Sequence, residues 1–313
     1  MGNTPIPISV LLTNLSDIHL AGISSLLLEV DRSPFQIVPP TSLDSLGQRI
    51  RELRPHLLLV GLPRKGVDVN GTIVGRIEET IAEIREQFPE IIIAVFAIPG
   101  VEEYREALAI TKRAGVEAEL SLEMKGMEMV RNLKQLLVER AEDYKKRLRD
   151  LPIGKDHWRD YELFAEEVLP FLFKPHFTRF RSQVRRGSGD RPDLVCRNEG
   201  QHKFCKIILQ KHDARYVVFE VKNQAKPEVG HLREMDAFLT PATTGRFGIL
   251  LVRQPPKQPQ TLYKRLGDLL KEKEKMIVVL CDDDVLKMLD MRIRLSEPMD
   301  YLEERYDHYM MHM

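Results

Sequence analysis

Two short segments of the chain carry charged side chains whose types and spacing suit hydrolysis at a metal ion. The segment 216–223 reads Tyr-Val-Val-Phe-Glu-Val-Lys-Asn, which is apolar enough for a buried strand but contains Glu220 and Lys222. Because side chains alternate along a strand, Glu220 and Lys222 point to the same face. Burying either charge alone is costly, so we interpret the pair as functional.

The second segment, 191–198, is also predicted to be a strand, and Asp193 lies near its start. If the two strands are neighbours, Asp193 brings a second carboxylate close to Glu220. Two carboxylates suit a hard divalent cation such as Mg²⁺. Lys222 would then stabilise or orient a nucleophilic water. The simpler alternative is an edge strand with a solvated Glu–Lys face.

The pattern Pro192-Asp193 followed by Glu220-Val221-Lys222 resembles the motif of the PD-(D/E)XK nuclease superfamily, the restriction-endonuclease-like fold with its Mrr-like members. The resemblance implies a Mg²⁺-dependent endonuclease, with Mn²⁺ as a substitute ion, that hydrolyses phosphodiester bonds. DNA is the expected substrate, and RNA stays open. The predicted elements follow the family's order: a helix over 161–173, a strand over 177–186, the two motif strands, a helix over 228–239 and a strand over 247–252.

The resemblance also implies roles for individual residues. Asp193, Glu220 and the backbone carbonyl of Val221 would bind the metal, and Lys222 would stabilise the charge that develops on phosphorus. An acid on the first helix often completes the site in this family. Glu162 is the first choice for that acid, and Glu166, one turn later on the same face, is the second.

Basic side chains gather just before and after the motif, where phosphate contacts supply affinity without sequence specificity. The alternative is an ordinary positive strand face. The candidate nucleic-acid contacts are Arg179, Arg181, Arg185, Arg186, Arg191, Asn223 and Lys226.

In the N-terminal half, apolar strands alternate with helices, which predicts a parallel, doubly wound, flavodoxin-like sheet. Over roughly residues 6–140 the order resembles the receiver domain of two-component response regulators, with residues 112–116 as the nearest local match. The chemistry of that family is missing. Asn14 and Leu15 replace the acidic pair, Gly61 replaces the phospho-accepting aspartate, and Ala97 replaces the hydroxyl residue. We therefore predict a pseudo-receiver that senses or dimerises.

The predicted fold class is α/β, with a receiver-like domain over 1–125, a connecting helix and linker over 126–153, and a nuclease-like domain with a mixed sheet over 154–313. The helix over 127–149 carries one apolar stripe: Val130, Leu133, Leu137, Ala141, Tyr144 and Leu148. Two interpretations stay open for this stripe. It either forms a homodimer as a short coiled coil or packs on its own domain.

Composition limits the remaining function classes. The formal net charge is +0, so a nucleic-acid site must be a local patch. The 3 cysteines have no metal-binding spacing, which is typical of a reducing cytoplasm. Apolar runs are too short to cross a bilayer, and no membrane partner is expected.

A role in restriction or defence follows from the resemblance only. The alternative function is a non-catalytic adaptor that binds DNA or protein through a nuclease-like fold.

Overall fold

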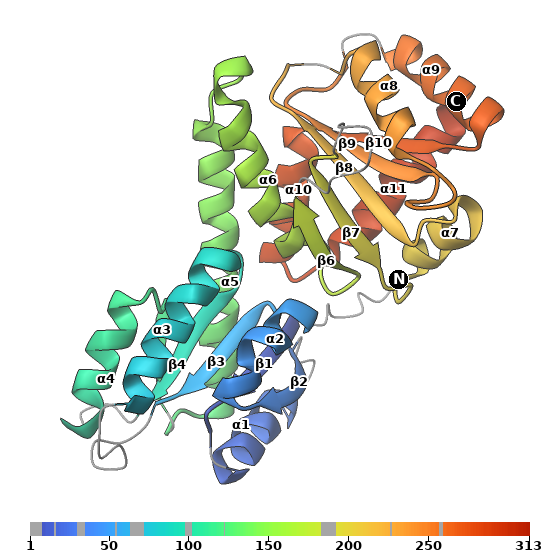
Figure 1. Cartoon of the computed structure of the whole chain (residues 1–313). Coiled ribbons are helices and arrows are strands. Elements are labelled where there is room, and N and C mark those ends of the chain that lie inside the picture. The colour runs from blue at the N-terminus through green and yellow to red at the C-terminus, as the bar shows by residue number, and fades with distance from the viewer. Residues whose placement is uncertain are drawn as a thin grey trace. The chain divides into compact units, whose positions relative to one another are not determined.

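The computed structural model describes residues 8–15, 17–29, 35–53, 55–62, 72–97, 102–121, 123–182, 192–225, 227–256 and 259–313. Arg185, Arg186, Arg191 and Lys226, which the sequence marks as nucleic-acid contacts, lie outside these residues. The chain forms two compact units, Met1–Arg140 and Ala141–Met313 (Figure 1). The division falls inside helix α5 (Gly126–Asp150), within the segment predicted to connect the domains.

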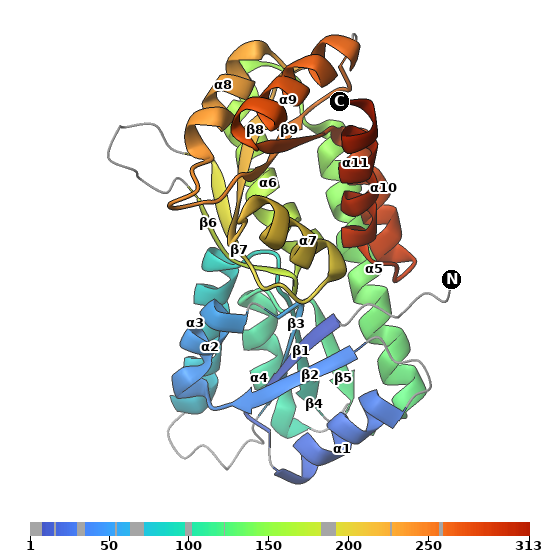
Figure 2. The same ribbon diagram turned by 90° about the vertical axis from the view of Figure 1, so that its right-hand side faces the viewer.

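The first unit contains a parallel sheet of 5 strands in the order β2-β1-β3-β4-β5. This strand order is that of the flavodoxin-like doubly wound fold, as predicted. Apolar residues of α2, α3 and α4 form one core with β1, β3 and β4, and Figure 2 shows α2 and α3 on the side of the sheet opposite α5. The elements are β1 (Ile8–Thr13), α1 (Asp17–Glu29), β2 (Phe35–Thr41), α2 (Leu43–Leu53), β3 (Leu57–Gly61), α3 (Thr72–Gln87), β4 (Ile92–Ala97), α4 (Glu102–Arg113) and β5 (Ala118–Ser121).

The second unit contains a mixed sheet of 5 strands in the order β10-β9-β8-β7-β6. The three strands β8, β9 and β10 are parallel, and β7 is antiparallel to both β6 and β8. The elements are a short 3₁₀ helix (Lys155–His157), α6 (Trp158–Phe173), β6 (Phe177–Ser182), β7 (Leu194–Asn198), α7 (Lys203–His212), β8 (Tyr216–Lys222), α8 (Val229–Phe238), β9 (Phe247–Val252), α9 (Pro259–Lys273), β10 (Met276–Leu280), α10 (Asp282–Ile293) and α11 (Pro298–His312).

A glycine on β9 fixes how α8 covers the sheet beside Glu220. Gly248 is the register partner of Val218. A Cβ atom built at Gly248 would lie 2.3 Å from the side chain of Met235 on α8. Helix α8 therefore packs on the face that carries Val218, and because strand side chains alternate, Glu220 and Lys222 share this face.

Taken from sequence alone, residues 203–209 after β7 permit either an extra strand or part of a long hairpin, but this segment forms helix α7. Phe204, Cys205, Ile208 and His212 are its buried side chains, and their spacing follows helical periodicity. His202 caps the helix, because its side chain accepts a hydrogen bond from the backbone N–H of Phe204. The alternating apolar pattern that favours a strand is absent here.

The apolar stripe of α5 is buried within the chain. Leu133 and Tyr144, one in each unit, are both fully buried, and so are the other stripe residues. Tyr144 packs against Phe164 and Phe171 of α6. The structure therefore favours packing of the stripe on its own chain, since the stripe has no exposed surface for a coiled coil.

Candidate active site

Glu220 lies in the interior of the second sheet, on the central strand β8. Its side chain is only 3% exposed. One carboxylate oxygen, Oε1, lies 2.5 Å from Nζ of Lys222. The other oxygen, Oε2, is buried and has no hydrogen-bond partner among the described residues. A buried acceptor without a partner is rare in native proteins and points to a missing ligand.

Asp193 precedes β7 and reaches the same end of β8. Its Oδ2 atom accepts a hydrogen bond of 2.7 Å from the backbone N–H of Val221. Continuing the register from Leu194, which pairs with Phe219, would place Pro192 opposite Val221. Proline has no N–H to donate, so Pro192 leaves the Val221 carbonyl without the usual ladder bond. The resemblance assigns this backbone oxygen to the metal.

Glu162 is a buried residue of α6, and Arg159 donates a 3.0 Å hydrogen bond to its carboxylate. Burial and the neighbouring Asp193 raise the pKa of Glu162. Glu166 is less buried and lies 3.7 Å from Arg159; burial raises its pKa as well. The charge of Asp193 contributes to the raised pKa of both glutamates, and Glu162 is the more buried of the two.

Burial shifts the pKa values of the carboxylates in this cluster upward. Burial, followed by the charge of Asp193, raises the pKa of Glu220 to about 8. Burial also raises the pKa of Asp193, against the opposing effects of the Val221 N–H and Lys222. Acids that lie close together in a buried site repel one another when ionised, so they tend to bind protons. A bound divalent cation would remove this repulsion.

Lys222 remains a cation in this environment. Burial alone would lower its pKa, but Glu220 and Asp193 raise it above the usual range. Glu234 of α8 adds a second ion pair at 3.1 Å. A protonated Lys222 is suited to electrostatic stabilisation of a phosphate, and its raised pKa argues against the general-base role.

Two polar residues beside the motif differ from expectation. His231 is buried rather than on the surface, and its Nδ1 accepts a hydrogen bond from the backbone N–H of Glu228 at the start of α8. Asn223, predicted to touch nucleic acid, is also buried, and its amide nitrogen donates to the carbonyls of Pro152 and Gly154. Asn223 thus binds the protein's own backbone. Sequence alone did not reveal this, because the partner carbonyls are remote in the chain.

Of the basic residues proposed as nucleic-acid contacts, Arg179 and Arg181 lie in the described structure. Both are exposed on β6, an edge strand of the sheet, while Phe180 between them is buried. Arg179 has a positive φ of 51°, where the pairing of β6 with β7 is irregular. The two arginines provide an exposed basic edge on β6.

Within the described ranges, one group of three potential metal ligands has its ligand atoms within 4.8 Å of one another: His202, Asp300 and Glu303. Glu162, Asp193 and Glu220 do not reach this spacing. The Nδ1 atom of His202 accepts from the Phe204 N–H, so the neutral ring carries its proton on Nε2, which faces Asp300. Metal-binding histidines instead donate from the second nitrogen. The His202 group is therefore a helix cap whose Nε2–H donates to Asp300.

The phosphorylation site of a receiver is closed in the first unit. Gly61 ends β3 at the position where a receiver carries its acceptor aspartate. A Cβ atom built there would lie 2.3 Å from the carbonyl oxygen of Asn14 and 2.6 Å from the Leu15 side chain. The side chain of Asn14 donates to the Gly61 carbonyl at 2.7 Å. The acceptor is absent, and its place is filled.

Comparisons with known proteins add little to the assignment made from the sequence. No family model matches the chain. A curated protein named for transposon gamma-delta, the 80.3 kDa protein of Escherichia coli (strain K12), is 27% identical over 106 residues. The match covers 34% of this chain and 15% of that protein, so the chain spans a small part of the relative's length.

The N-terminal part of the chain is similar to solved receiver domains. A response regulator from Thermotoga maritima is 16% identical with a TM-score of 0.33, covering 42% of this chain and 97% of that chain. The receiver domain of an HD domain-containing protein from Pseudomonas fluorescens Pf-5 is 16% identical with a TM-score of 0.35, covering 46% and 95%. The fold assignment of the first unit rests on its strand order. Among the described helices, none has the length and apolar composition needed to cross a bilayer.

Proposed function

We propose that the second unit is a metal-dependent nuclease of the PD-(D/E)XK type that hydrolyses phosphodiester bonds, with DNA as its substrate. The observation that carries the proposal is the buried Oε2 of Glu220, which has no hydrogen-bond partner among the described residues and belongs to the carboxylate that contacts Lys222. The order of elements supports it, since an acidic helix, a strand, two motif strands, a helix and a strand follow one another, with α7 inserted between the motif strands.

The carboxylate and carbonyl oxygens of this cluster are donor atoms that suit a hard divalent cation. Asp193, Glu220 and the Val221 carbonyl would hold Mg²⁺ or Mn²⁺, and Glu162 would join them from α6. When bound, the ion would polarise the phosphoryl oxygen and supply a hydroxide-like nucleophile. Lys222 meets the negative charge that develops on the phosphate, and Glu234 keeps the lysine ammonium at the site.

Nucleic acid is the expected substrate because a basic edge belongs to the same unit. Arg179 and Arg181 present exposed guanidinium groups on β6, which pairs with the motif strand β7. Phosphate contacts of this kind position a duplex without reading its sequence. The relative named for a transposon is compatible with a DNA substrate. The first unit serves as a pseudo-receiver that senses a signal or dimerises, in a restriction or defence role.

The test is cleavage of supercoiled plasmid and single-stranded DNA in Mg²⁺ or Mn²⁺. The wild type should cut, and Glu220→Gln should lose activity by at least ~10²-fold. Glu167→Gln is the matched control, because Glu167 lies on α6 but pairs with Arg147. Equal activity of the wild type and Glu220→Gln would contradict the proposal.

The competing function is a non-catalytic adaptor that binds DNA or protein. Calorimetric titration with Mn²⁺ separates the two, because only the nuclease requires a divalent ion at Asp193 and Glu220. A wild-type protein that binds DNA but neither binds Mn²⁺ nor cuts would establish the adaptor.

A further inference from the structure

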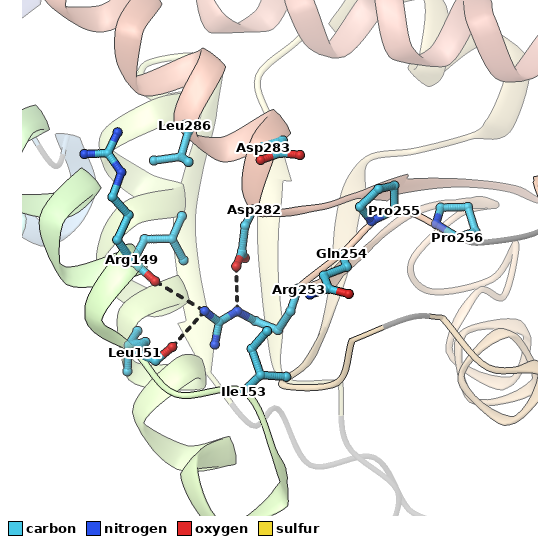
Figure 3. A pocket seen from close by; sticks show the side chains of 11 residues that line it. Arg149, Leu151, Ile153, Arg253, Gln254, Pro255, Pro256, Asp282, Asp283 and Leu286 are labelled. Atoms are coloured by element: carbon cyan, nitrogen blue, oxygen red, sulfur yellow. Dashed lines mark hydrogen bonds and ion pairs between the residues drawn. The ribbon is translucent and has the colours of Figure 1, made fainter.

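A buried arginine follows β9 at the carboxyl ends of the parallel strands. Arg253 is 4% exposed, and its Nε atom donates to Oδ2 of Asp282 at 2.7 Å. Its Nη2 atom donates to the carbonyl oxygens of Leu151 at 2.9 Å and Leu148 at 3.2 Å (Figure 3). The guanidinium thus joins the end of β9, the start of α10 and the segment that leads toward α6.

Another partner of Arg253 adjoins the proposed catalytic lysine. Nη1 donates to Oδ1 of Asn223 at 2.8 Å, and Asn223 directly follows Lys222 in the chain. The Asn223 amide in turn donates to the carbonyls of Pro152 and Gly154, and the Gly154 N–H returns a bond to the Asn223 carbonyl. The end of β8 is therefore bonded to the segment before α6.

Helix α6 is held by the same cluster. The Tyr161 hydroxyl donates to Oδ1 of Asp282 at 2.9 Å, and the guanidinium carbon of Arg253 lies 4.7 Å from the centre of the Tyr161 ring. Tyr161 immediately precedes Glu162. One arginine thus links the strand that carries Glu220 and Lys222 to the helical turn that carries Glu162.

Only an arginine can make this set of bonds. Its planar guanidinium presents five donors in fixed directions, whereas a lysine ammonium is a compact charge on a flexible stem. A buried ion pair is weak evidence for stability, because apolar residues of similar volume often replace it without loss. The specific contribution of Arg253 is therefore to hold its partners in fixed positions relative to one another.

We infer that Arg253 is a positioning residue of the proposed metal site, which fixes Glu162 on α6 relative to Glu220 and Lys222 on β8. This inference rests on the proposed function. Arg253 touches neither substrate nor metal, and it acts through Asn223 and Tyr161. Partners of this kind, behind the ligands, typically change metal affinity by 10–100-fold when they are removed.

The experiment compares Arg253→Lys with Arg292→Lys in the full-length protein. Arg292 is the matched control: it is 5% exposed and also donates to backbone carbonyls, those of Leu172 and Lys174 at the opposite end of α6. The readouts are the Mn²⁺ dissociation constant from calorimetry, the Mg²⁺ concentration for half-maximal plasmid cleavage, and Tm.

Both variants should lower Tm, but only Arg253→Lys should weaken Mn²⁺ binding and raise the half-maximal Mg²⁺ concentration, each by roughly tenfold or more. Asn223→Ala should reproduce the effect on the metal if Arg253→Lys fails to fold. The inference would be overturned if the Mn²⁺ dissociation constants of Arg253→Lys and Asn223→Ala stayed within twofold of the wild-type value. It would also be overturned if Arg292→Lys lost as much Mn²⁺ affinity as Arg253→Lys. Either result would leave the proposed function standing. A wild type that binds no Mn²⁺ would overturn the proposed function and the inference with it.

Discussion

At the scale of single residues, Glu220 and Lys222 differ in how burial affects their charge. Both lie on β8, and a 2.5 Å contact joins them. Burial and Asp193 raise the pKa of Glu220 to about 8, while the surrounding acids keep Lys222 protonated. In the proposed metal site these acids would release their protons as a divalent ion binds, while Lys222 keeps its charge.

The first residue-scale prediction concerns the pH dependence of stability without metal. The native pKa of Glu220, about 8, lies above the reference value of 4.5, so between these values the folded state keeps a proton that the unfolded state has lost. Stability therefore falls as pH rises through this window. Since one pKa unit is worth ~1.4 kcal/mol, Glu220→Gln should be more stable than the wild type by roughly 2–4 kcal/mol at pH 8.

Denaturant unfolding at pH 4.5 and pH 8, in the presence of a chelator, measures this difference. Glu234→Gln is the control, because Glu234 contacts the same lysine from a half-exposed position. A Glu220→Gln advantage of equal size at both pH values would argue against a raised pKa.

The second residue-scale prediction separates the roles of Lys222 and the carboxylates. Lys222→Met should reduce plasmid cleavage by ~10²-fold or more, because the developing phosphate charge loses its cation. Calorimetric Mn²⁺ binding should persist, since Lys222 is not a ligand. Lys203→Met provides the control, as Lys203 is exposed and pairs with Glu303 away from the motif. Unchanged cleavage by Lys222→Met would remove the lysine from the mechanism.

At the scale of elements, the two sheets use the ends of their strands differently. In the second unit, the β7–β8 hydrogen-bond ladder ends at Pro192 and Asp193. There the backbone N–H of Val221 donates to the Asp193 side chain instead of to a strand partner. In the first unit, the segment after β1 closes over the end of β3, where Asn14 binds the Gly61 carbonyl. Near the end of β8 a buried carboxylate oxygen of Glu220 has no partner among the described residues, whereas the end of β3 is closed by Asn14.

The element-scale prediction is that an aspartate cannot restore phosphorylation to the first unit. In Gly61→Asp the new Cβ would lie 2.3 Å from the Asn14 carbonyl oxygen, so the segment after β1 must move. We expect a loss of roughly 2 kcal/mol or more in stability and no phosphate incorporation from acetyl phosphate. Gly47→Asp is the control, since nothing lies within 4 Å of a Cβ there. Stable phosphorylation of Gly61→Asp would show that the site is open.

At the scale of the whole molecule, the chain builds two separate hydrophobic cores, each around its own sheet. Leu58 of β3 is fully buried in the first core, and Val279 of β10 is buried in the second sheet. Helix α5 contributes to both units, because the division falls within it. Loss of packing in one core should therefore leave the chemistry of the other unit intact.

The whole-molecule prediction follows from this separation. Leu58→Ala should destabilise the first unit by about 3 kcal/mol through the cavity that it leaves. The Mn²⁺ dissociation constant should stay within twofold of the wild-type value, as calorimetry can check below the unfolding temperature. Val279→Ala, in the second core, is the comparison, and it should lower the stability of the second unit. A tenfold loss of Mn²⁺ affinity in Leu58→Ala would show that the units are energetically coupled.

The sequence by itself determined the alternation of strands and helices, the doubly wound first sheet, the missing receiver chemistry at Gly61 and the acidic motif of β8. These features are local: apolar periodicity, strand length and turn residues are visible within a few residues of chain. The nuclease assignment and its site residues stay predictions. The description of 203–209 as a strand or hairpin was wrong, because the helical spacing of Phe204, Cys205 and Ile208 was overlooked.

Only the tertiary structure decided which of the marked polar residues are buried and what they bind. In sequence, Asn223 resembles an exposed ligand-contacting residue and His231 resembles a surface residue. Both are buried against backbone groups. The role of Arg253 was likewise invisible, since its partners at Leu148, Asn223 and Asp282 are distant in the chain. Whether a polar side chain is buried, and which group it bonds, depends on which segments distant in the chain pack together. The residues next to it in sequence do not reveal those contacts.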